Sequence, residues 1–292
     1  MVKTYSQLYM DTRRALIETE GVDMASQMAR TLLCHVSGKT HAQILAGRDL
    51  YASEAICQAM EDGTKRLLNG EPIAYILGEW EFYGLKLVVN KNVLIPRDDT
   101  CAVAELAIKQ GIFLDQNPRI LDLCCGSGCI GLAVATRVKD AKVTLADLSK
   151  DALAVAKQNV ANHHLAGRVN CIQADALQPA SAFLGKFDMI VSNPPYIDAA
   201  DMKTLDKSVI DFEPYMALYG GEDGLDFYRA IVKNFTSALK PGGYLCFEFG
   251  EDQGDDICTI LEANGYTILE RKKDFNDTER AVLAQYLRKE EE

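Results

Sequence analysis

The stretch Arg119-Ile120-Leu121-Asp122-Leu123-Cys124-Cys125-Gly126-Ser127-Gly128 decides the fold class of this chain. Its first half is an apolar run that predicts a buried strand, and its second half is a glycine turn before a helix. Glycine in such a turn lets a ligand approach the backbone, and the helix N-terminus adds partial positive charge. The stretch therefore predicts a ligand site at the first strand-to-helix turn of an α/β sheet.

Strands and helices alternate after this stretch, which indicates a doubly wound, mostly parallel seven-stranded sheet with helices on both faces. The last two strands follow one another directly, so we expect the sheet to end in an antiparallel hairpin. The predicted strands are Arg119–Leu123, Lys142–Ala146, Val169–Gln173, Phe187–Val191, Gly243–Phe249, Tyr266–Glu270 and Ala281–Leu287, and the predicted helices are Thr100–Gln110, Cys129–Val138, Lys150–Asn162, Leu225–Leu239 and Asp252–Ala263.

The first part of the chain has a different pattern. Residues 1–78 have apolar positions at helical spacing and are expected to form a small helical domain, with helices in Tyr5–Ile17, Met24–Val36 and Ile56–Leu68. Thr40 begins a capping box for a short helix between them. Residues 79–96 alternate like strands around Gly84 and predict a β-hairpin linker, with a further strand at 93–95. Residues 97–292 form the remaining α/β domain.

Composition excludes several classes of protein. The chain has 292 residues, 48% of them hydrophobic, which is enough for a substantial core. Its 31 Lys and Arg against 42 Asp and Glu give a net charge of −11, which argues against binding that depends on phosphate neutralisation. Nine scattered cysteines without a secretory start indicate reduced thiols in the cytoplasm, and no ligand set for a metal accompanies them. No apolar run reaches the roughly 18 residues of a membrane helix, so we expect a soluble protein.

Carboxylates occur at the ends of the first three predicted strands. Asp147 closes the second strand, where it can accept hydrogen bonds from ribose hydroxyls, and Asp175 follows the third, where it can accept from an adenine amino group. The spacing Gly126-x-Gly128-x-x-Gly131 also satisfies the dinucleotide fingerprint. A carboxylate at Asp122 suits a cationic cofactor better than a pyrophosphate, which favours S-adenosylmethionine.

A second candidate site is Asn193-Pro194-Pro195-Tyr196, which follows the strand Phe187–Val191. Neither proline has an N–H, and both stiffen the backbone, so the tetrad presents carbonyls, one amide and one aromatic face. Such a site accepts hydrogen bonds from an NH2 group. Asn-Pro alone is more often a simple turn, but here the glycine loop and Asp147 place a methyl donor nearby.

Together these segments resemble the class I S-adenosylmethionine-dependent methyltransferases, and more narrowly the peptide chain release factor glutamine methyltransferases. Asn-Pro-Pro-Tyr is shared with enzymes that methylate amino groups of nucleic-acid bases, so the flanking segments carry the narrower resemblance. It extends over nearly the whole chain through Glu81-Phe82-Tyr83-Gly84, Leu94-Ile95-Pro96-Arg97, Ile120–Gly128, Val191–Ile197, Glu213-Pro214, Ala217-Leu218, Gly220–Asp226 and Leu239–Gly243.

The resemblance implies a Rossmann-like methyltransferase domain that methylates the glutamine of a Gly-Gly-Gln loop, with a helical domain that helps hold the release factor. It implies a cytoplasmic monomer whose partners are release factors and which binds no nucleic acid directly. The cofactor, S-adenosyl-L-methionine, would contact Asp122, Cys124, Cys125, Gly126, Ser127, Gly128, Asp147, Asp175, Ala176 and Asn193. Asn193, Pro194 and Tyr196 would be catalytic, holding the glutamine amide and walling its slot, and Pro195 and Arg97 would join them in substrate binding.

The chain departs from this family's usual pattern at three places. It has Cys124 where the family has Gly, Asp98-Asp99 within a segment that is usually Pro-Arg-Pro-Glu-Thr, and Asp277-Thr278 where a Gly-Arg pair is usual. A side chain at position 124 tests the loop conformation, because it restricts positive φ. The other two departures concern substrate handling more than chemistry.

Three alternatives remain at the level of sequence. A methyltransferase for an amino group of a nucleic-acid base would need a basic, aromatic-lined surface. A nicotinamide-dependent oxidoreductase is supported only by the literal glycine fingerprint, and a non-catalytic cofactor-binding module only by Cys124. No base is evident in the tetrad, so we expect the proton released after methyl transfer to go to water, without a pH step due to one side chain.

Overall fold

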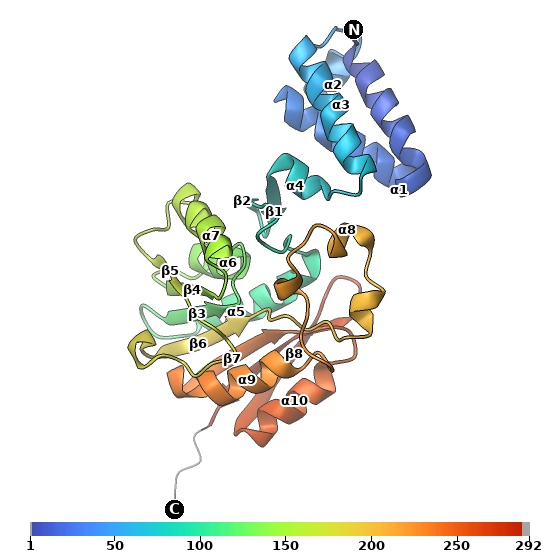
Figure 1. Ribbon diagram of the computed structural model, residues 1–292. Coiled ribbons are helices and arrows are strands. Elements are labelled where there is room, and N and C mark those ends of the chain that lie inside the picture. Colours follow the sequence, from blue (N-terminus) through green and yellow to red (C-terminus); the bar gives the residue numbers. More distant parts are fainter. Residues whose placement is uncertain (1, 288–292) are drawn as a thin grey trace, which may run out of the picture. The chain divides into compact units, whose positions relative to one another are not determined.

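A computed structural model describes residues 2–287 of the chain (Figure 1). The described residues fall into two units. The first comprises residues 2–78 together with Lys207–Phe212, and the second comprises Glu79–Asp206 and residues 213–287.

The first unit is helical. Its core lies between helices α1 and α3, where Leu16, Leu32 and Met60 are fully buried. Gly21 interrupts α1 with non-helical dihedrals (φ 76°, ψ 170°), so this long helix is two helices in series, as the glycine predicts. Thr4 and Thr40 form capping boxes with Gln7 and Gln43. The helices are α1 (Tyr5–Ser37), α2 (His41–Ala46), α3 (Glu54–Leu68), α4 (Ile73–Leu77) and, from later in the chain, α8 (Lys207–Ile210).

The hairpin of β1 (Glu79–Phe82) and β2 (Leu85–Val88) belongs to the second unit. Its turn residues Tyr83 and Gly84 both have positive φ, 51° and 76°, as in the turns that match the twist of paired strands. The buried side chain of Asn159 accepts from the N–H of Val88 (2.7 Å) and donates to its carbonyl (3.0 Å), which anchors the hairpin.

The strand predicted at 93–95 is wrong. The chain turns there instead, because the N–H of Val93 donates to the carbonyl of Asn90 (3.0 Å). The N–H of Ile95 then donates to the carboxylate of Glu213 (3.1 Å), far away in sequence. A side-chain acceptor therefore replaces the partner strand that the alternating pattern suggested.

The sheet has the predicted α/β architecture. Within residues 2–287 it contains seven strands in the order β5-β4-β3-β6-β7-β9-β8. Neighbouring strands from β5 to β7 are parallel, and β9 runs antiparallel between β7 and β8, as expected from the final hairpin. The strands are β3 (Arg119–Leu123), β4 (Lys142–Asp147), β5 (Val169–Gln173), β6 (Phe187–Ser192), β7 (Leu239–Glu248), β8 (Tyr266–Lys273) and β9 (Glu279–Tyr286).

Helices cover both faces of this sheet (Figure 1). One apolar core lies under α5, α6 and α7, and a second lies under α9 and α10. The helices are α5 (Cys101–Ile112), α6 (Cys129–Arg137), α7 (Lys150–Asn162), α9 (Asp226–Phe235) and α10 (Gly254–Ala263). α9 ends earlier than predicted, and a 3-10 turn at Thr236–Ala238 leads into β7. β7 begins earlier than predicted and carries a bulge before Tyr244, where Gly242 takes a φ of 73°.

The order of strands reverses between β3 and β6, which are neighbours although β4 and β5 intervene in sequence. Leu123 lies opposite Ser192 in the register, and the Ser192 hydroxyl donates to the Leu123 carbonyl (2.5 Å). The glycine loop and the Asn-Pro-Pro-Tyr tetrad therefore start side by side at the carboxyl edge, where α/β sheets bind their ligands.

Candidate active site

A cavity of about 400 Å³ opens at this edge of the sheet, within the second unit. It brings together most of the residues predicted for the site, although they come from four different strand ends. Those that line it are Cys124, Cys125, Gly126, Ser127, Asp147, Asp175, Ala176, Asn193 and Pro195. Arg97, Asp122, Gly128, Pro194 and Tyr196 lie outside this lining.

The glycine loop has an unusual backbone. Cys124, Gly126 and Gly128 have φ values of 61°, 52° and 82°, all in the left-handed region. Cys124 therefore takes the conformation for which the similar family uses Gly. A Cβ on Gly126 would meet no atom within 4 Å, so the backbone there faces open space. Gly128 caps α6 and is placed by packing, since its Cβ would lie 2.8 Å from Leu145.

Asp122 lies beneath this loop and is only 1% exposed. One oxygen, Oδ2, accepts from the N–H of Gly131 (2.8 Å), which braces the start of α6. The other, Oδ1, is buried and has no hydrogen-bond partner within residues 2–287. Burial raises the pKa of Asp122 to about 7, and the Gly131 N–H opposes this shift. The residue thus braces the loop with one oxygen, and its other oxygen is buried without a partner among the described residues.

Asp147 and Asp175 lie along the cavity wall at the ends of β4 and β5. Asp147 accepts from the N–H groups of Gly126 (2.8 Å) and Ser149 (2.9 Å), which fixes the orientation of its carboxylate. Its burial raises its pKa. Asp175 accepts from the N–H of Leu177 (2.9 Å) and so forms its own turn.

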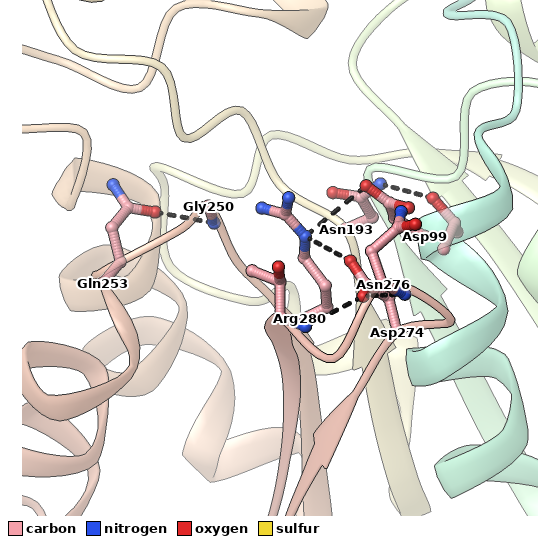
Figure 2. A network of polar contacts seen from close by, with 9 residues as sticks. Asp99, Asn193, Gly250, Gln253, Asp274, Asn276 and Arg280 are labelled. Carbon is pink, nitrogen blue, oxygen red and sulfur yellow. Dashed lines mark hydrogen bonds and ion pairs between the residues drawn. The ribbon is translucent and has the colours of Figure 1, made fainter.

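The tetrad is held from both sides. Asn193 donates from Nδ2 to the hydroxyl of Thr100 (3.4 Å). The carbonyl of Tyr196 accepts from Gln253 Nε2 (3.0 Å), and Gln253 Oε1 accepts from the N–H of Gly250 (3.0 Å; Figure 2). Tyr196 is half-buried against the core under α9, and its burial raises its pKa. These contacts fix both ends of the Asn-Pro-Pro-Tyr backbone.

The glycines after the tetrad pack directly against it. The N–H of Ile197 donates to Leu218, and the carbonyl of Ile197 accepts from Gly220 (2.8 Å), which forms a short parallel bridge. A Cβ on Gly220 would lie 2.7 Å from the Pro195 carbonyl, and one on Gly224 would lie 2.3 Å from the Tyr196 carbonyl. Only glycine allows this close approach.

Arg97 does not face the cavity. Its guanidinium, 42% exposed, pairs with the carboxylate of Glu213, which is buried. Glu213 also holds the N–H of Ile95, so it ties the segment after the hairpin to the segment that leads back to the cavity wall. Pro214 and Tyr215, the next residues, line the cavity.

The departures from the family pattern have definite places in the structure. Asp99 pairs with Arg280 (3.4 Å), which also pairs with Asp274 (3.0 Å), and Figure 2 shows Asp99 and Arg280 close to Asn193. Asp277 takes a φ of 66°, in the left-handed region, where the family has Gly, and its carboxylate contacts Lys273 (2.9 Å).

Sequence reasoning missed Glu248, the last residue of β7, which is 2% exposed. Burial raises its pKa to about 8, and hydrogen bonds from Thr100 and Asn193 oppose the shift. The available signal was a charged residue inside the apolar run Leu245-Cys246-Phe247-Glu248-Phe249. Such a residue at a strand end, beside a ligand site, is a candidate for function.

The charge of the cavity discriminates between cofactors. Among the described residues that line it, Asp147, Asp175 and Asp226 carry charge, and Lys, Arg and His are absent. A cation is stabilised by such a lining, whereas the pyrophosphate of a dinucleotide is repelled. This acidic wall fits the sulfonium and ammonium groups of S-adenosylmethionine. Three or more metal-ligating side chains do not converge anywhere in residues 2–287, and no helix there is long and apolar enough to span a membrane.

The sheet order and the acid-lined cavity define a class I S-adenosylmethionine-dependent methyltransferase. Residues 108–211 match the methyltransferase small domain family, residues 7–78 match the PrmC N-terminal domain, and the release factor glutamine methyltransferase of Clostridium acetobutylicum is 39% identical, with 88% of this chain and 90% of that protein covered. The chain belongs to the release factor glutamine methyltransferase family.

Other relatives agree with this assignment. The release factor glutamine methyltransferase of Chlorobaculum tepidum is 35% identical over 94% of both chains. Among solved structures, a methyltransferase from Pyrococcus furiosus is 18% identical, with a TM-score of 0.51, and covers 78% of this chain and 99% of that one. The similarity to the Pyrococcus furiosus structure concerns the fold alone.

Proposed function

We propose that this methyltransferase transfers a methyl group from S-adenosylmethionine to the side-chain amide nitrogen of the glutamine in the Gly-Gly-Gln loop of peptide chain release factors. The observation that carries the proposal is the orientation of Asn193. Its Nδ2 donates to Thr100, so its Oδ1 is left for a donor in the cavity that it lines. The family to which the chain belongs supports the same substrate.

A carboxamide nitrogen is a poor nucleophile, because its lone pair is delocalised into the carbonyl. The proposed role of the tetrad is to accept both of its N–H hydrogens, one on Asn193 Oδ1 and one on the Pro194 carbonyl. Positioning of this kind can supply up to roughly 7–11 kcal/mol of the barrier. The same two oxygens stabilise the positive charge that develops on the nitrogen, and Tyr196 limits the width of the slot.

When bound, S-adenosylmethionine supplies a methyl group activated by a sulfonium. We propose that the loop Cys124–Gly128 holds its methionine end, with Asp122 bracing this loop from beneath. Asp147 would hold the ribose, and Asp175 with Ala176 the adenine. The protein would act as a cytoplasmic monomer with a release factor as its partner.

The test is incubation of the protein with methyl-labelled S-adenosylmethionine and either a release factor or tRNA. Label on the release factor that disappears when the Gly-Gly-Gln glutamine is replaced by Ala supports the proposal. Label on the RNA would instead assign the enzyme to an amino group of a nucleic-acid base, and label that stays on the glutamine variant would exclude this glutamine as the acceptor.

A further inference from the structure

A polar chain extends behind Asn193, and its last member, Glu248, has no part in the proposed chemistry. It consists of Asn193, the buried hydroxyl of Thr100 and the buried carboxyl of Glu248. Asn193 Nδ2 donates to Thr100 Oγ1 (3.4 Å), and hydrogen bonding from Thr100 and Asn193 lowers the pKa of the Glu248 carboxyl. One carboxyl oxygen, Oε2, is buried without a hydrogen-bond partner in the described part of the chain.

The direction of these hydrogen bonds follows from the carboxylate. An ionised carboxylate only accepts, so the Thr100 hydroxyl must donate to it, and the remaining lone pairs of that hydroxyl must accept. Asn193 can hydrogen-bond to both the Thr100 hydroxyl oxygen and the Glu248 carboxylate only with its NH2 group. The oxygen and NH2 of a carboxamide have nearly the same shape, so packing alone does not decide which of them faces the cavity.

We propose that Glu248 is a positioning residue that, directly and through Thr100, holds the Asn193 carboxamide with Oδ1 turned toward the acceptor nitrogen. This inference rests on the proposed function for the identity of the group that Asn193 contacts. Without Glu248 the carboxamide can rotate, and its NH2 then faces the NH2 of the substrate. Two NH2 groups cannot hydrogen-bond to one another through their donors, so the substrate amide loses its hydrogen bond to Asn193 and keeps only the one to the Pro194 carbonyl.

The charged surroundings allow this residue to change state near neutral pH. Burial raises the pKa of Glu248 to about 8. Asp99 raises it further, whereas Arg280 lowers it, as do the hydrogen bonds from Thr100 and Asn193. Burial also raises the pKa of Cys101 to about 11. It likewise raises the pKa values of the Cys129 thiol and of the Tyr196 and Tyr228 phenols. The titratable groups that interact electrostatically with Glu248 are Asp99, Cys101, Cys129, Tyr196, Tyr228 and Arg280.

A pH dependence follows. Below its pKa, Glu248 is neutral and carries a donor, so Thr100 and Asn193 are no longer forced into one direction. Above its pKa, the carboxylate imposes the productive direction. Methyl transfer should therefore rise with pH through the titration of Glu248, in contrast to the flat profile expected from the tetrad alone.

The experiment compares Glu248→Gln with the wild-type chain and with Glu262→Gln, an exposed site on α10. We expect kcat for methylation of the release factor to fall at least tenfold in Glu248→Gln, its rise between pH 6 and 9.5 to disappear, and the Kd for S-adenosylmethionine by calorimetry to stay within twofold. Glu262→Gln should match the wild type. Unchanged kcat and pH profile in Glu248→Gln would overturn the proposal, as would a loss confined to cofactor affinity.

A second pair of variants keeps the test valid if Glu248→Gln does not fold. Thr100→Ser retains the hydroxyl and should keep at least half of the wild-type kcat, whereas the isosteric Thr100→Val, which leaves only the direct contact between Asn193 and Glu248, should fall below half. Equal rates for the two Thr100 variants would contradict the relay through this hydroxyl.

A spectroscopic measurement separates the two proposals. In the full chain labelled with [15N]asparagine, and assigned with Asn193→Asp, the Asn193 NH2 signals should move with pH in the wild type and stay constant in Glu248→Gln, which removes the titrating group. Signals that do not move in the wild type overturn the role of Glu248. A wild-type chain that transfers no methyl group to the release factor overturns only the proposed function, since the spectrum still decides on Glu248.

Discussion

Cys124 shows that a residue with a side chain takes the left-handed backbone conformation that glycine usually supplies. Its φ of 61° lies in the left-handed region, which costs a residue with a side chain roughly 1–2 kcal/mol relative to glycine. The half-buried side chain packs against the core under α9 and offsets part of this cost. The loop therefore keeps the conformation that glycine would take.

This conformation makes a prediction for two substitutions. Cys124→Gly should change the free energy of unfolding by less than about 1 kcal/mol, because relief of strain is offset by the greater entropy of the unfolded chain. Cys124→Val should destabilise by about 2 kcal/mol or more, since a β-branched residue rarely takes positive φ. Urea unfolding measures both, with Cys258→Val in α10 as the control. A Val variant as stable as the Gly variant would show that the loop is not strained.

Asp122 predicts how the stability of the cofactor-free protein depends on pH. Its folded-state pKa of about 7 lies above the value in an unfolded chain. The unfolded state therefore loses its proton first as pH rises, and stability falls by up to about 1.4 kcal/mol per pH unit between the two pKa values. Asp122→Asn removes this term, so its Tm should decline less than the wild-type Tm between pH 5 and 7. Parallel Tm curves in calorimetry would contradict it.

Asn193 and Asp147 should separate catalysis from cofactor binding. Asn193→Ala removes an acceptor for the substrate amide, so kcat should fall about 100-fold or more, as for loss of one such preorganised contact, with little change in the Kd for S-adenosylmethionine. Asp147→Ala removes a carboxylate that faces the proposed ribose, so it should weaken cofactor binding about tenfold or more. Calorimetry and single-turnover rates measure the two effects. Equal collapse of cofactor binding in Asn193→Ala would show that its role is misassigned.

At the scale of elements, the glycine-containing segment 220–224 determines how closely the chain packs against the Asn-Pro-Pro-Tyr tetrad. Gly224 has a φ of 72°, and its Cβ would lie 2.3 Å from the Tyr196 carbonyl. Gly224→Ala should therefore destabilise the second unit by about 2 kcal/mol, by strain and displacement, and should lower methyl transfer by shifting the tetrad. Gly167→Ala is a matched control, because Gly167 has open space around its Cβ. A Gly224→Ala chain with wild-type rate and stability would mean that the segment can move freely.

The elements themselves were largely predictable, because strand and helix leave local patterns. β3 and β5 and helix α7 have the predicted bounds, and the break at Gly21 follows from one glycine. The contacts that complete the site were not predictable in the same way. Glu248, Gln253 and Asn159 act on residues that are distant in sequence, and only the packing of strands and helices against one another brings them together.

The predicted site residues divide according to the same rule. The glycine loop, Asp147 and Asn193 lie at strand ends, which a pattern of apolar runs can locate, and they meet in one cavity. Arg97 was assigned from resemblance alone, and in the structure its guanidinium is engaged by Glu213. A role for Arg97 in substrate binding stays a prediction.

At the scale of the whole molecule, Glu213 marks a return of the chain into the second unit. Its carboxylate, 1% exposed, holds Arg97 and the N–H of Ile95, and the residues after it line the cavity. Glu213→Gln should loosen this segment, raising the KM for the release factor several-fold while the Kd for S-adenosylmethionine changes less than twofold. Steady-state kinetics with each substrate varied measures the split. Reduced affinity for S-adenosylmethionine with an unchanged KM for the release factor would show that Glu213 supports cofactor binding instead of substrate binding.

Within residues 2–287 the chain passes between the two units three times, after residues 78, 206 and 212. Lys207–Phe212 belongs to the helical unit, and Phe212 lies 3.8 Å from where a Cβ of Gly70 would be. The helical unit is thus encoded in two separate pieces of the gene. A truncated chain that begins at residue 79 keeps Lys207–Phe212 but lacks the rest of the helical unit. Recombination of a single contiguous segment of the gene therefore cannot add or remove this unit. Chimeras between relatives must exchange both segments together.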